Sequence, residues 1–97
     1  MTPPRVHVWP WLRRPAKLML RDWLAITLGR RIFAWRDMTD GELAHELAHV
    51  RQWEQHGWSF PLIYLAESLR ARRSGRRWYQ DNHFEIEARE ASRPTLD

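Results

Sequence analysis

Residues 42–54 read ELAHELAHVRQWE, and the interpretation of the whole chain depends on this stretch. Thr39 lies three residues before Glu42, an arrangement typical of the capping box that begins a helix. Gly57 is a typical residue to end a helix as its C-cap. Apolar residues recur at helical spacing between these two ends, at Leu43, Leu47, Val50 and Trp53. The pattern predicts one helix with a buried stripe.

Two histidines and a glutamate on this helix form a His-Glu-x-x-His pattern. His45 and His49 are four residues apart, so both imidazoles project from one face of the helix and can bind one zinc ion. Glu46 is turned by about 100° and lies beside the metal, where its carboxylate can take a proton from water activated by zinc. We therefore predict His45 and His49 as zinc ligands and Glu46 as the general base. The alternative is an ordinary surface pair of histidines.

A third ligand has to come from another part of the chain, because catalytic zinc sites normally have three protein ligands and one open position. The segment NHFEIEAREA, residues 82–91, offers Glu85 and Glu87. It follows His49 at a distance that lets an intervening helix turn back. These glutamates would otherwise form a solvated helix face opposite nearby arginines. The residues alone leave Glu85 and Glu87 open as the third ligand.

Composition limits the classes of function. The chain has 97 residues, enough for one small domain, and it has no cysteine, so disulfides and thiolate metal sites are excluded. The net charge of +4 is compatible with nucleic acid, an anionic membrane surface or a solvated exterior, and core packing accounts for most of the seven tryptophans. Nucleic acid is therefore not the favoured partner. No apolar run is long enough to span a bilayer, and no signal peptide is evident, so we expect a cytoplasmic protein.

The remaining elements predict an α+β fold in which a small antiparallel β-hairpin or sheet packs on about three helices. Prolines in residues 1–15 indicate an extended Pro/Trp-rich arm, and residues 16–97 form the single domain, with a short helix at 16–23. Two β-favouring runs, 24–28 and 31–35, flank Gly29-Arg30 and predict a hairpin with a type II′ turn.

Two further helices are predicted towards the C-terminus. The first begins at Ser59 with Pro61 in its first turn, and Ser74-Gly75 ends it. Its expected buried face comprises Leu62, Ile63, Leu65, Ala66 and Leu69. The last helix runs from Asn82 to Ser92, with Asn82 as its cap, and stops before Pro94.

A His-Glu-x-x-His helix followed by a Glu-x-x-Ala helix resembles the gluzincin metallopeptidases, and this compact form is similar to the minigluzincins. The chain also resembles the eCIS core domain, which is often appended to phage-tail-like injection systems. The resemblance covers residues 25–91 and depends on the motifs HELAH (45–49) and EIEA (85–88). It implies a minimal zincin-like domain that hydrolyses peptides or unfolded proteins, with one zinc ion held by His45, His49 and Glu85.

The resemblance also implies that an edge strand of the hairpin binds the substrate, since an exposed edge can add an extended peptide as one more strand. Arg89 stands where many membrane-embedded relatives have an aspartate that supports a histidine ligand. Losing such a partner commonly costs 10–100-fold in affinity or activity, so another group must orient the imidazoles. A zinc-stabilised scaffold or interaction module with little activity is the alternative function.

Three other side chains are candidates for supporting roles. Tyr79 and His83 precede the third-ligand helix and are donors of a suitable type to stabilise an oxyanion. His7, in the N-terminal arm, raises the hypothesis that the arm lies in the cleft and that its imidazole takes the fourth position on zinc.

Overall fold

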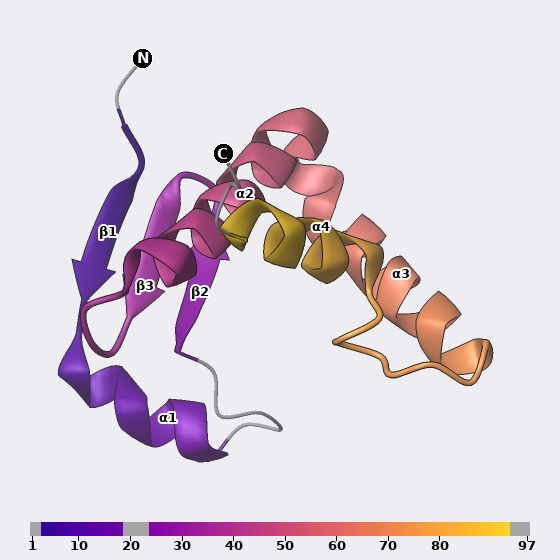
Figure 1. Cartoon of the computed structure of the whole chain (residues 1–97), viewed down its shortest axis with the longest axis horizontal. Helices are drawn as coiled ribbons and strands as arrows, with labels where there is room; N and C mark the ends of the chain where they lie inside the picture. Colours follow the sequence, from indigo (N-terminus) through magenta and orange to yellow (C-terminus); the bar gives the residue numbers. More distant parts are fainter. Residues whose placement is uncertain (1–2, 19–23, 94–97) are drawn as a thin grey trace.

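The structure of this chain, a computed structural model, describes residues 3–18 and 24–93 (Figure 1). It is a small α+β fold in which a three-stranded sheet packs against helices, which confirms the predicted fold class. The elements in chain order are β1 (Arg5–Val8), η1 (Pro10–Leu12), α1 (Arg13–Leu18), β2 (Ala25–Leu28), β3 (Arg31–Ala34), α2 (Asp40–His56), η2 (Gly57–Ser59), α3 (Phe60–Arg73) and α4 (His83–Ser92).

The predicted hairpin is present as β2 and β3, which pair antiparallel. Gly29 opens the loop with a φ of 63°, a conformation that glycine adopts without steric cost, whereas Arg30 has no positive φ. A type I′ turn would need a positive φ at both positions, so these values fit the predicted type II′ turn. The strand order is β1-β3-β2, which makes β2 an outer strand of the sheet in the described part of the chain.

The N-terminal segment takes a larger part in the fold than the sequence indicated. Arg5–Val8 forms β1, which pairs parallel with β3 and places Val6 opposite Ile32. Prolines flank this strand and do not interrupt it, so its backbone donors remain available to the sheet. Residues 5–8 of the predicted extended arm therefore form one strand of the sheet. The helix expected at 16–23 is α1, which begins earlier, and residues 19–23 lie outside the described residues.

Helix α2 has the predicted ends. The Thr39 side chain accepts a hydrogen bond from the Glu42 amide while the Glu42 carboxylate accepts one from the Thr39 amide, which completes the capping box. Gly57 ends the helix with a φ of 61°. The Arg36 guanidinium and the Thr39 amide lower the pKa of Glu42 to about 2. The helix contacts both β2 and α4, so it lies between the sheet and the last helix (Figure 1).

Helix α3 has the predicted limits, with Ser59 as N-cap and Pro61 in its first turn, but the predicted buried face is wrong. Leu62 is 72% exposed, and Leu65, Ala66 and Leu69 are also exposed. The buried positions are Phe60, Ser68 and Ala71, with Tyr64 half-buried beside them. Polar contacts from Ser68 and Tyr64 to α4 fix this rotation of the helix, and they override the apolar pattern.

Helix α4 begins at the predicted cap. The Asn82 side chain accepts a hydrogen bond from the Phe84 amide and donates to Ser68 Oγ and to the Tyr64 carbonyl oxygen, and Asn82 is fully buried. The cap therefore also joins α4 to α3. Among the described residues no helix combines the length and apolar character needed to cross a bilayer.

Candidate metal centre

Two helices that are far apart in the sequence bring three metal-ligand side chains together. His45 and His49 come from one face of α2, with ring centroids 5.0 Å apart, and the buried Glu85 comes from α4. Glu85 Oε1 lies 3.1 Å from His45 Nε2 and 3.2 Å from His49 Nε2. The potential ligand atoms of the three residues all lie within 4.8 Å of one another. These are the three residues that the sequence and the resemblance predicted as ligands.

The donor set fits a zinc ion. Two ligands at about 2.0–2.1 Å from a tetrahedral zinc are separated by about 3.3 Å. The distances from Glu85 Oε1 to the two imidazole nitrogens are close to this value. Two neutral imidazoles and one carboxylate also match the ligand types of zinc hydrolases, which keep a fourth position for water or substrate. A small rearrangement would therefore be enough for these residues to hold the ion.

The charges in the cluster favour an ionised carboxylate. Burial would raise the pKa of Glu85, but hydrogen bonds from His45, His49 and Tyr64 outweigh it and hold this pKa far below its ordinary value. Burial would lower the pKa of His49, yet the contact with the Glu85 carboxylate raises it. The cluster thus stabilises positive charge beside Glu85 Oε1, where a cation would be bound.

Tyr64 is a partner of Glu85 that the sequence did not indicate. Its hydroxyl donates to Glu85 Oε2 at 2.5 Å, so one oxygen of the carboxylate faces the tyrosine and the other faces the histidines. This contact fixes the rotation of the carboxylate and leaves Oε1 directed at the two imidazoles. Tyr64 lies on α3, so all three long helices contribute to the cluster.

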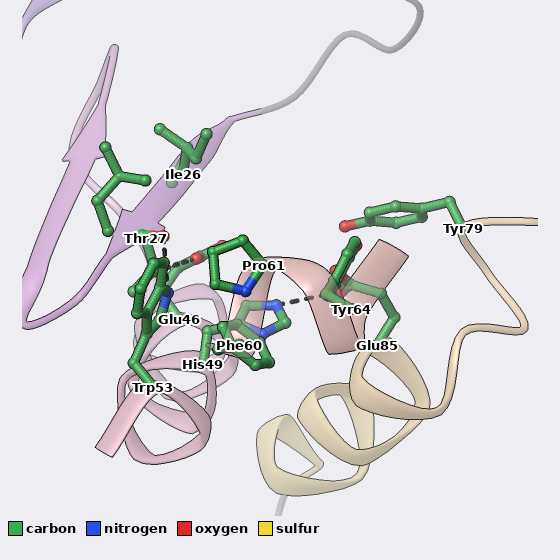
Figure 2. Close-up of a pocket in the computed structure, with 12 residues that line it drawn as sticks. Ile26, Thr27, Glu46, His49, Trp53, Phe60, Pro61, Tyr64, Tyr79 and Glu85 are labelled. Carbon is green, nitrogen blue, oxygen red and sulfur yellow. Dashed lines mark hydrogen bonds and ion pairs between the residues drawn. The ribbon is translucent and has the colours of Figure 1, made fainter. Parts of the chain in front are cut away.

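Glu46 lies where a general base is expected, beside the histidines and at the wall of a cleft (Figure 2). Thr27 Oγ1, from β2, donates to Glu46 Oε2 at 2.8 Å and holds the carboxylate towards the sheet. Burial raises the pKa of Glu46, while the hydrogen bond from Thr27 and the nearby histidines oppose this shift. A carboxylate with a raised pKa is a better proton acceptor near neutral pH than an ordinary glutamate.

The cleft has a volume of about 370 Å³ and contains Glu46, His49 and Glu85 on one wall. Residues 25–28 of β2 form a second wall, and aromatic and apolar side chains from α2, α3 and the loop before α4 form the remainder (Figure 2). The indole nitrogen of Trp53 donates to the Thr27 carbonyl oxygen, which ties α2 to this strand. The outer strand, the carboxylate base and two of the three candidate ligands, His49 and Glu85, therefore face one cavity.

Of the other predicted candidates, Tyr79 lines the cleft, whereas His83 and Glu87 do not. Tyr79 lines the cleft, and Figure 2 shows its ring extending towards Tyr64. The His83 side chain is 66% exposed and lies 3.8 Å from Glu87, so it does not line the cleft. Glu87 is exposed and accepts a hydrogen bond from Gln52, which leaves Glu85 as the glutamate beside the histidines.

His7 does not belong to this group. It lies on β1, on the far side of β3 from β2, and its ring stacks on Phe33 with centroids 5.0 Å apart. The metal-ligand group among the described residues does not include it. The hypothesis that His7 occupies the fourth position on zinc is therefore not supported.

The partner that orients His49 is another residue that the sequence did not indicate. Arg89, at the position where the resemblance would place an aspartate, donates to the Gln80 carbonyl oxygen. The side-chain oxygen of Gln52 lies 2.8 Å from His49 Nδ1 and takes that supporting place. Gln52 follows His49 by three residues, so helical spacing was the signal that could have identified it.

Comparisons of this chain with protein-family models, curated proteins and solved structures give no match. The functional interpretation therefore depends on the geometry of the cluster and the cleft.

Proposed function

We propose that this chain is a zinc-dependent peptidase that hydrolyses peptide bonds in extended peptides or unfolded proteins. The observation that carries the proposal is the convergence of His45, His49 and Glu85 next to Glu46, at a cleft that the outer strand β2 bounds. A zinc ion bound there would act as a Lewis acid towards the substrate carbonyl and would make a water molecule easier to deprotonate.

The protein side chains would then carry out the proton transfers. Glu46 accepts a proton from the attacking water as the water oxygen bonds to the carbonyl carbon. The same carboxyl group passes that proton to the nitrogen of the leaving amine as the carbon–nitrogen bond breaks. The raised pKa of Glu46 supports both steps, because the group must bind and release a proton within one turnover. Of the two predicted donors, Tyr79 lines the cleft and is the one that could donate towards the oxygen on which negative charge develops.

The cleft supports a substrate in extended conformation. A peptide can add to the outer edge of β2 through main-chain hydrogen bonds, which demand little of its sequence. Trp53, Phe60 and Pro61 form an apolar wall beside this edge, so a peptide with a large apolar side chain near the cleaved bond would bury that side chain there.

The test compares wild-type protein with Glu46→Gln, using Glu54→Gln on the same helix as the control. Glu54 is exposed and forms an ion pair with Arg30, away from the candidate ligands. We expect all three proteins to bind one zinc ion, measured by elemental analysis. Cleavage of unfolded proteins, followed by mass spectrometry, should fall by about 10²–10⁴-fold in Glu46→Gln alone.

The alternative function is a scaffold that zinc stabilises. It has one observation in its favour, since α2, α3 and α4 each bury polar side chains, among them His49, Ser68 and Glu85, and a bound metal would strengthen the association of the helices. A purely structural site needs no base, so Glu46 favours the peptidase. Zinc-loaded wild-type protein that is as inactive as Glu46→Gln towards every unfolded substrate would establish the scaffold instead.

A further inference from the structure

Gln52 is a buried polar residue between the two helices that supply the candidate ligands. It is 1% exposed and makes three hydrogen bonds. Its side-chain oxygen lies 2.8 Å from His49 Nδ1, and its side-chain nitrogen lies 3.0 Å from the Phe84 carbonyl oxygen and 3.0 Å from Glu87 Oε1. One amide therefore connects a candidate ligand on α2 to the turn of α4 that carries the third ligand.

The partners of Gln52 fix the orientation of its amide. The Phe84 carbonyl oxygen can only accept a hydrogen bond, and so can the ionised Glu87 carboxylate. The group that faces them must be the donor, which is the amide nitrogen Nε2 of Gln52. The amide oxygen must then face His49, and it can only accept. His49 Nδ1 consequently carries a hydrogen.

This assignment determines what the other ring nitrogen of His49 offers. With the hydrogen on Nδ1, the neutral imidazole has its lone pair on Nε2. That nitrogen lies 3.2 Å from Glu85 Oε1, an oxygen that His45 Nε2 also approaches to 3.1 Å. In the charged ring Nε2 donates to this oxygen, whereas in the neutral ring its lone pair faces the carboxylate, which is unfavourable unless a cation lies between them. The amide thus presets His49 as an Nε2 donor to a cation.

We propose that Gln52 is the positioning residue of the metal centre: it fixes the Nδ1–H tautomer of His49 and ties the Glu85 segment of α4 to α2. This role rests on the proposed zinc site, to which it adds the neutral amide that performs both tasks. Loss of Gln52 should therefore weaken zinc binding even though this side chain does not touch the ion.

The test replaces Gln52 with methionine, which has a similar length and cannot make these hydrogen bonds. Gln55→Met, at an exposed position on the same helix, is the matched control. Zinc affinity is measured by competition with a chromophoric chelator. We expect a loss of about 10–100-fold for Gln52→Met and no change for Gln55→Met. Thermal unfolding of each zinc-free protein shows whether the variant is folded.

A second readout follows the tautomer directly. Long-range ¹H–¹⁵N spectra of the zinc-free protein, at a pH above the range in which histidine is charged, distinguish the protonated from the unprotonated ring nitrogen. Wild type and Gln55→Met should show His49 with hydrogen on Nδ1. Gln52→Met should show a mixture of both tautomers, because no acceptor holds Nδ1–H. A purely structural role for Gln52 would not shift this population.

A second variant covers the case in which Gln52→Met fails to fold. Gln52→Glu keeps an acceptor for His49 and loses both donors, and combining it with Glu87→Gln removes the repulsion between two carboxylates. This double variant should keep the Nδ1–H tautomer. The inference is overturned if Gln52→Met keeps the wild-type tautomer and zinc affinity, or if the double variant folds and loses the tautomer. Wild-type protein that binds no zinc would defeat the proposed function alone, and the zinc-free spectra would still decide the role of Gln52.

Discussion

The buried cap of α4 offers the most direct test of how the fold positions the candidate ligand. Asn82 is fully buried, and its side chain accepts from the Phe84 amide while donating to Ser68 Oγ and the Tyr64 carbonyl oxygen. Asn82→Ala removes all three hydrogen bonds and creates no new charge. Since Glu85 lies one turn into the helix, the same change should also disturb the cluster.

The magnitude follows from the contacts that are lost. Replacing an asparagine N-cap with alanine costs about 1 kcal/mol of unfolding free energy, with a range of about 0.5–2. Each of the two hydrogen bonds to α3 contributes about 1 kcal/mol, and leaving a buried carbonyl without a donor adds to this cost. We expect a total loss of about 3 kcal/mol. For a domain of this size, that loss lowers the melting temperature by about 12–24 °C.

The assay is urea unfolding of the protein in the presence of a chelator, so that metal binding does not contribute to the measured stability. Ser68→Ala is the companion variant, because it removes one partner of Asn82 and leaves the cap intact. It should cost about 1 kcal/mol in the wild-type background. In the Asn82→Ala background it should cost markedly less, because the shared hydrogen bond is already absent. Equal costs in both backgrounds, or a loss below about 1 kcal/mol for Asn82→Ala, would refute the reasoning.

Three further predictions test the metal, the base and the cap of α2. Zinc at a hundredfold excess over its dissociation constant should stabilise wild type by about 2.7 kcal/mol, and the same concentration should stabilise Glu85→Gln much less, as followed by thermal unfolding. Thr27→Val removes a hydrogen bond that lowers the pKa of Glu46, so the acidic limb of the kcat/KM profile should move to higher pH; an unmoved limb would contradict this. The folded-state pKa of Glu42 is depressed to about 2, so its contribution to stability is present above its unfolded pKa of about 4.3 and is lost as the pH falls towards 2. The difference in unfolding free energy between wild type and Glu42→Gln should accordingly be largest above about pH 5 and shrink below it.

The sequence predicted the parts of the site that lie on one helix. The spacing of His45, Glu46 and His49 fixes their relative directions once the helix is known, and Thr39 and Gly57 mark its ends. These features are local, so no tertiary information was needed to place them. The type II′ hairpin was predictable for the same reason, because Gly29 supplies the conformation of its turn.

The choice between the two glutamates of α4 could not be made from the residues alone. Phe84 and Ala88 mark the buried face of this helix, and Glu85 and Glu87 lie about 80° to either side of it. The apolar pattern is therefore symmetric with respect to the two carboxylates. Contacts with α2 break the symmetry, since one glutamate meets the histidines and the other meets Gln52.

Tertiary contacts also explain why the buried face predicted for α3 is wrong and why β1 was not predicted. The leucines of α3 are exposed because Tyr64 and Ser68 are needed on the inner face, where they bind Glu85 and Asn82. A hydrophobic pattern depends only on the positions of apolar residues and contains no information about these polar contacts between helices. The strand β1 is four residues long and pairs parallel with a strand far along the chain, so no local turn indicated it.

The outer position of β2 has a consequence for the protein in concentrated solution. Apart from the Thr27 carbonyl oxygen, which accepts from Trp53, the main-chain groups on the outer edge of β2 can pair with the same strand of another copy as well as with a peptide, and such edges promote aggregation. The opposite edge of the sheet begins after Pro3 and Pro4 with Arg5, residues that discourage this pairing, whereas Ala25–Leu28 contains neither a charge nor a proline. Because β2 lacks these features, two copies of the chain can associate through it. A charged substitution at Leu28 should reduce this self-association, and it should also weaken the binding of any peptide that pairs with the same main-chain groups.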